Sequence, residues 1–177
     1  VEVALFASAL RTAMLTSFVL VAVNSIAAPK FAAMHRTGDL SSLRRVALFS
    51  VRLMLLAAVP VLVFMLAMPE WLMGWFGPEF VAAAPALQIL AVGQFVNIAT
   101  GSVGFLLSMT GHEKLLRTNV LIAASVGVGL GLALIGPFGI VGAAVATAAA
   151  VATQNLLGVL QVKRVLGFNT MAFWRRG

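Results

Sequence analysis

The feature that most constrains this chain is a series of long apolar runs, each bounded by a short segment that carries the charges. Five such runs cover approximately residues 3–28, 46–68, 85–109, 119–135 and 140–162. A helix of about 20 apolar residues crosses a bilayer, and backbone in lipid must satisfy its own hydrogen bonds. The runs therefore predict an all-α, polytopic transmembrane bundle of about five membrane-spanning helices, within one domain that covers residues 1–177.

The composition indicates a membrane protein, with the lipid bilayer as one of its partners. Hydrophobic residues make up 62% of the 177 residues and charged residues only 10%, whereas a soluble domain carries about 25% charged residues. The net charge of +7 does not indicate a nucleic-acid partner, because the basic residues lie in separate clusters between apolar runs. The chain has no cysteine and two histidines, both in charged segments, so we expect no metal site and no cofactor.

The acidic residues all lie at the ends of the runs or between them. None is placed inside a run, where it would serve a catalytic triad or couple transport to protons or sodium. We therefore expect that the chain is not an enzyme. The chain opens with Val1 and Glu2, which is unlike a signal peptide, and we interpret it as a piece of a longer protein. The acidic residues are Glu2, Asp39, Glu70, Glu79 and Glu113.

The basic residues alternate from one connecting segment to the next. Lys and Arg occur in loops 29–45 and 110–118 and in the C-terminal tail, but not in residues 69–84 or 136–139. Basic loops remain in the cytoplasm, so this alternation predicts a multi-pass plasma membrane protein whose N-terminal end lies outside. The segment after residue 68 also holds Trp71 and Trp75, which predict a short interfacial helix or, alternatively, a platform for stacking sugars.

Arg11 is the strongest candidate for a binding residue. It lies about two helical turns from the outer end of the first run, at a depth where a charge usually faces a cavity or the interior of a bundle. Ser8 and Thr12 flank it on the same helical face. A guanidinium binds a phosphate or diphosphate through two parallel hydrogen bonds. The alternative is that the Arg11 side chain extends to the outer interface. Arg52, in the second run, would extend to the cytoplasmic interface or, alternatively, guard the cytoplasmic mouth of a cavity.

Amides in the apolar runs are the remaining candidates. In one continuous helix over 85–109, the polar and small residues Gln94, Asn97, Gly101, Gly104 and Ser108 would fall within about 80° of one another. Such a stripe either lets helices pack closely or lines a cavity that hydrogen-bonds sugar hydroxyls. Asn24 in the first run has the same two interpretations.

The order of short motifs resembles the C-terminal half of polysaccharide and O-antigen (Wzx-type) flippases, within the multidrug/oligosaccharidyl-lipid/polysaccharide exporter superfamily. The matching stretches are "VALFASALRTAML", "AAPKFAAMHRTGDLSSL", "FGPEF", "LQILAVGQ", "TGHEK" and "GIVGAAVAT". This resemblance implies part of the C-terminal lobe of a two-lobe MATE-like fold in a bacterial inner membrane. It also implies a polyprenyl-diphosphate-linked oligosaccharide as substrate, flipped to the outer leaflet by alternating access for cell-surface polysaccharide biosynthesis.

The same resemblance implies particular residues and partners. Arg11 matches a basic residue early in the corresponding helix and would bind the diphosphate, while Ser8, Asn24, Arg52, Gln94 and Asn97 are candidates for lining the cavity. The N-terminal lobe of the same protein would be one partner, and a polysaccharide polymerase or export machinery another. A multidrug exporter, a peptidoglycan lipid II flippase and a membrane scaffold that transports nothing remain as alternatives. A multidrug exporter would favour an anionic cavity, which the apolar runs do not provide.

Overall fold

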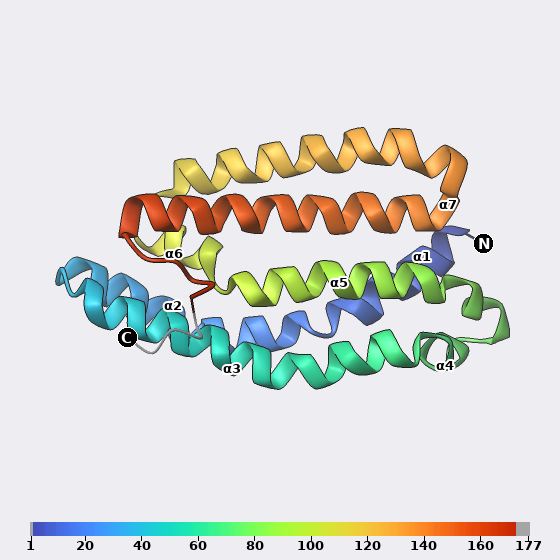
Figure 1. The fold of residues 1–177 in the computed structure, drawn as a ribbon, viewed down its shortest axis with the longest axis horizontal. Helices are drawn as coiled ribbons and strands as arrows, with labels where there is room; N and C mark the ends of the chain where they lie inside the picture. Colours follow the sequence, from blue (N-terminus) through green and yellow to red (C-terminus); the bar gives the residue numbers. More distant parts are fainter. Residues whose placement is uncertain (1, 173–177) are drawn as a thin grey trace.

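The computed structural model describes residues 2–172, and every regular element in that range is a helix (Figure 1). The last part of the C-terminal tail, for which a cytoplasmic location was predicted, lies outside the described residues. The elements in chain order are α1 (Glu2–Met14), α2 (Ser17–Arg36), α3 (Leu40–Ala67), α4 (Pro69–Gly74), the 3₁₀ helix η1 (Pro78–Ala83), α5 (Ala84–Thr100), α6 (Val103–Met109) and α7 (Glu113–Leu166).

Four helical segments in the described part of the chain are long and apolar enough to cross a membrane. They are α2, α3, η1 together with α5, and α7. About five spans were predicted, with residues 119–135 and 140–162 as separate helices, and these two ranges lie on opposite sides of a break inside α7. In the structure both belong to α7, whose 54 residues are interrupted only at Gly139, with φ 53° and ψ −128°. Figure 1 shows that α7 folds back there into two antiparallel legs lying side by side.

The first expected span, 3–28, is wrong in two respects. It is divided between α1 and α2, because the amides of Leu15 and Thr16 bond carbonyls three residues back and the Thr16 hydroxyl donates to the Ala13 carbonyl at 2.8 Å. It also continues through Pro29 to Arg36. Proline removes a helical hydrogen bond, but Phe31 just beyond it is fully buried, and this packing keeps the chain helical.

The third expected span, 85–109, is also not one helix. It breaks after Thr100, where Gly101 adopts φ 77° and a methyl group of Val51 occupies the place of a Cβ. Only glycine fits there, because the backbone is in a region disfavoured for other residues and because α3 is in contact. The predicted single stripe from Gln94 to Ser108 is therefore interrupted, and Ser108 belongs to the separate helix α6.

The connecting segments are shorter than predicted, since most of loops 29–45 and 110–118 is helical. Only residues 37–39 separate α2 from α3, and residues 110–112 separate α6 from α7. Asp39 caps α3 by accepting hydrogen bonds from the Ser42 amide at 3.0 Å and the Ser41 hydroxyl at 2.8 Å. These bonds, with Ser42 the largest contributor, lower the pKa of Asp39 to about 2.

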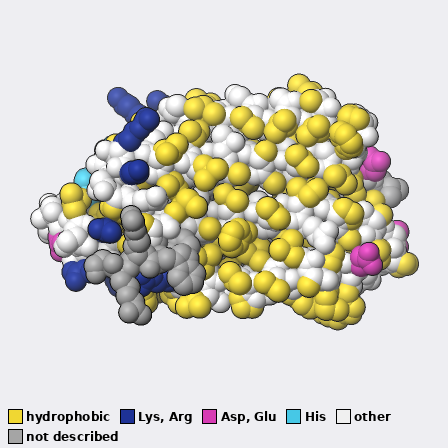
Figure 2. All heavy atoms as spheres, in the orientation of Figure 1, with side chains coloured by type: hydrophobic (Ala, Val, Ile, Leu, Met, Phe, Trp, Pro, Cys, Tyr) yellow, Lys and Arg dark blue, Asp and Glu magenta, His cyan; other side chains and the backbone are white. Residues whose placement is uncertain are grey.

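Charge is segregated along the long axis of the bundle. Figure 2 shows Lys and Arg gathered at one end and most visible acidic side chains at the other. The basic end holds the α2–α3 turn, the start of α7 and the end of α7 (Figure 1). The acidic end holds α4, η1 and the start of α1, where Glu2 lies. Between these ends, the face in Figure 2 shows many hydrophobic side chains and no charged ones, as expected for a bundle that faces lipid.

Candidate functional site

Arg11 lies on the exposed face of α1, near the break between α1 and α2. It lines an open pocket of about 400 Å³ whose other walls come from both sides of that break. The pocket walls are mostly apolar, so a charge or anion there is less screened than in water. The residues that line it with Arg11 are Met14, Leu15, Ser17, Phe18 and Val21.

One wall of this pocket connects to a polar cluster inside the bundle. Ser17 lines the Arg11 pocket, and its hydroxyl donates a hydrogen bond to the Gln94 side-chain carbonyl at 3.4 Å. The Asn97 amide donates to the same oxygen at 3.3 Å. Gln94 is buried and Asn97 is half-buried, so α2 and α5 are joined here by polar contacts in an apolar environment.

The structure brings together three of the predicted site residues through this arrangement. Arg11 shares a pocket with Ser17, and Ser17 bonds Gln94, which in turn bonds Asn97. Sequence reasoning identified the two amides because they are three residues apart on one helical face. It missed Ser17, whose only signal was its position beside Thr16 in the middle of an apolar run.

The other predicted residues lie apart from this cluster. The Ser8 hydroxyl donates to the carbonyl of Ala4 one turn back at 2.9 Å. Asn24 is only 2% exposed, and its side-chain oxygen is buried without a hydrogen-bond partner. Arg52 is exposed on α3 and does not line the Arg11 pocket. Thr12, expected beside Arg11, is buried and donates to its own helix.

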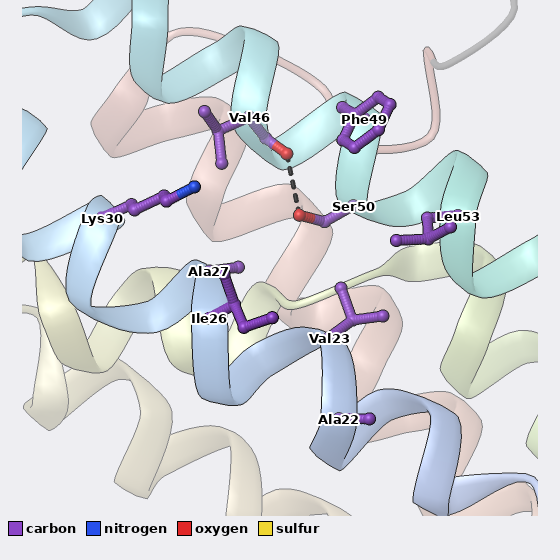
Figure 3. Close-up of a pocket in the computed structure, with 9 residues that line it drawn as sticks. All are labelled: Ala22, Val23, Ile26, Ala27, Lys30, Val46, Phe49, Ser50 and Leu53. Carbon is purple, nitrogen blue, oxygen red and sulfur yellow. Dashed lines mark hydrogen bonds between the residues drawn. The ribbon is translucent and has the colours of Figure 1, made fainter.

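A second pocket opens between α2 and α3, closer to the basic end. Its volume is about 420 Å³, and Lys30 is its only charged lining residue (Figure 3). The sequence predicts a loop at Lys30, because a helix is expected to end at Pro29, whereas the structure continues α2 to Arg36. The pocket depends on two helices that meet only in the folded bundle, so no sequence signal indicated it.

The acidic end carries an aromatic cluster. The rings of Trp71 and Trp75 lie 4.5 Å apart between centroids, and Phe64 contacts Trp71 edge-on at 5.5 Å. Trp75 is 72% exposed. The predicted short helix is present as α4, and its exposed indoles suit the boundary between lipid and water.

The described residues contain no group of three or more His, Cys, Asp or Glu side chains placed to hold a metal ion. No protein-family model, curated protein or solved structure matches this chain.

Proposed function

We propose that this chain is part of a flippase that moves a polyprenyl-diphosphate-linked oligosaccharide across a bacterial inner membrane by alternating access. The observation that carries the proposal is the exposed Arg11 over an apolar pocket at the α1–α2 break. Arg11 lies nine residues after Glu2, or about 14 Å along a helix, a position at which a charge in a membrane usually serves a function.

The pocket matches the two chemical parts of such a substrate. The guanidinium of Arg11 offers paired donors to a diphosphate, and the apolar walls formed by Leu15 and Phe18 suit a prenyl chain. The Ser17 hydroxyl lines this pocket and, while it donates to Gln94, it can still accept a hydrogen bond from a sugar hydroxyl. No bond is broken in this transfer, so the protein needs to lower only the barrier to crossing the bilayer.

The segregation of charge supports an orientation. In this proposal the basic end faces the cytoplasm and the acidic end, where α1 begins, faces outward. A multidrug exporter of cationic compounds is less well supported, because the Arg11 pocket is lined by a cation and by no carboxylate.

The test uses the protein expressed from its complete open reading frame in a strain that lacks its own flippase. Lipid-linked oligosaccharide that reaches the outer leaflet is measured for wild type, Arg11→Lys, Arg11→Gln and Arg11→Ala at matched membrane levels. We expect Arg11→Gln and Arg11→Ala to reduce delivery about tenfold or more, the loss expected for one charge-assisted hydrogen bond. We expect Arg11→Lys to retain part of the delivery, because it keeps the positive charge.

Arg44→Gln is the matched control, because Arg44 is exposed at the basic end and away from the pocket. Normal delivery by all three Arg11 variants would show that Arg11 only extends to the interface. Failure of the wild type to deliver any oligosaccharide would refute the flippase itself.

A further inference from the structure

A row of exposed residues runs along α1 and α2 from Arg11 to Lys30. The members in α2 are spaced by four residues and share one helical face, while Arg11 and Leu15, before and at the break, adjoin Phe18 in the Arg11 pocket; no acidic residue lies in the sequence between the two cations. Nineteen residues at about 1.5 Å each give about 28 Å, close to the thickness of the hydrocarbon core. The row consists of Arg11, Leu15, Phe18, Ala22, Ile26 and Lys30, all exposed.

Each end of this row has its own pocket. The Arg11 pocket ends at Val21, and the pocket between α2 and α3 begins at the next residue, Ala22. The two pockets therefore follow one another along the same helix. Each has a single charged lining residue, which is a cation, and walls that are otherwise almost entirely apolar.

The chemistry of the second pocket can be read from Figure 3. Lys30 extends from α2 toward the gap between α2 and α3, with its ammonium near Val46. Ser50 is the other polar lining residue, but its hydroxyl already donates to the Val46 carbonyl at 2.8 Å. Phe49 and Ile26, both 64% exposed, line the same pocket. The pocket therefore offers one donor group that the described residues leave without a partner; this group is positive and lies beside apolar lining residues.

The surroundings of this pocket are also positive. Arg45 lies one turn before Phe49 on α3, on the basic side of the pocket. The one acidic residue of the adjoining turn, Asp39, is engaged in capping α3. Basic pockets between membrane helices favour lipids with anionic head groups. A ligand with a phosphate head and a long apolar chain fits this combination.

We propose that the Lys30 pocket is the loading site at which the diphosphate of the lipid-linked substrate first binds, before the head group reaches Arg11 along the same face. This inference rests on the proposed flippase function and assigns Lys30 a role in it. The apolar residues from Leu15 to Ile26 would contact the prenyl chain while the head group moves from Lys30 at one end of the row to Arg11 at the other.

The experiment is photo-crosslinking of a diazirine-bearing polyprenyl diphosphate to the complete protein in phosphatidylcholine nanodiscs, with the labelled residues mapped by mass spectrometry. Wild type should be labelled at residues of the Lys30 pocket. Lys30→Gln should lower this labelling about tenfold, the loss expected for one charge-assisted hydrogen bond to phosphate, while Lys30→Arg should retain it. Lys114→Gln, another exposed lysine at the basic end, is the matched control and should leave labelling unchanged.

A second variant tests the apolar slot. Ala22 is exposed and lines the pocket, so Ala22→Phe should fill the slot without disturbing the core and should also abolish labelling there. Equal labelling of wild type and Lys30→Gln would overturn the proposal. So would full competition by phosphatidylglycerol at equal concentration, which would make the pocket a general site for anionic phospholipids.

Failure of this inference can be distinguished from failure of the flippase function. Labelling at the Arg11 pocket alone, with normal delivery of oligosaccharide by Lys30→Gln, would remove the loading site and leave the flippase intact. Absence of delivery by the wild type would refute both.

Discussion

The two legs of α7 are held together far from their turn by a reciprocal pair of amides, and this pair gives a quantitative test of the fold. The Asn119 amide donates to the Gln161 side-chain carbonyl at 2.8 Å, and the Gln161 amide donates back at 2.7 Å. Asn119 is fully buried. The two residues lie 20 and 22 positions from Gly139, about 30 and 33 Å along their legs, so they join the ends of the hairpin opposite its turn.

The perturbation is a double-mutant cycle with Asn119→Leu, Gln161→Met and both together. Each single change removes two hydrogen bonds and leaves the other amide, buried in Asn119 or half-buried in Gln161, without its partner, which costs about 2–3 kcal/mol. The double variant leaves no unpaired amide and should lie within about 1 kcal/mol of wild type. The coupling free energy should therefore be about 3–6 kcal/mol, above the usual range for a polar pair between membrane helices.

The assay is equilibrium unfolding in mixed detergent micelles, followed by circular dichroism. Ser125→Ala is the control, because Ser125 is exposed on the same leg and its hydroxyl bonds only the Leu121 carbonyl one turn back. This control should change the free energy of unfolding by less than about 0.5 kcal/mol. Additive effects of the two amide changes, with a coupling free energy below about 0.5 kcal/mol, would refute the idea that this pair of amides holds the two legs of α7 together.

Two further predictions concern the turn of α7 and the cap of α3. A Cβ at Gly142 would meet the backbone carbonyl of Leu134, so Gly142→Ala should lower the free energy of unfolding by about 1–3 kcal/mol. Gly136→Ala is the control, because a Cβ at Gly136 meets open space and should not lower stability. Thermal unfolding of the two variants distinguishes them. Asp39 has its pKa lowered from 3.8 to about 2, so its stabilising contribution is complete above pH 4 and disappears as the pH falls toward 2. Asp39→Asn should lower the melting temperature at pH 7 and lose that difference at pH 2; an equal difference at both pH values would contradict the capping role of the carboxylate.

The candidate site was only partly predictable. Arg11 was identified because a charge inside an apolar run is rare, and the structure places it exposed, lining a pocket next to the helix break. Gln94 and Asn97 were identified from their spacing in one helix. Their link to the Arg11 pocket depends on Ser17 in another helix, and Lys30 gained its pocket only when α3 packed beside α2.

The sequence by itself determined the helical character of this protein and the separation of its charges into opposite ends. Long apolar runs must form helices in lipid, and their basic boundaries are visible in the sequence. Only the tertiary structure decided which faces are buried, because a helix that is apolar on all sides carries no hydropathy period to mark its contacts. The tight contact of Gly101 with Val51, the burial of Phe31 beyond Pro29 and the pairing of Asn119 with Gln161 all arise from packing between distant segments. The contact of Gly101 with Val51 accompanies the break after Thr100, and the packing of α3 beside α2 forms the pocket in which Lys30 lies.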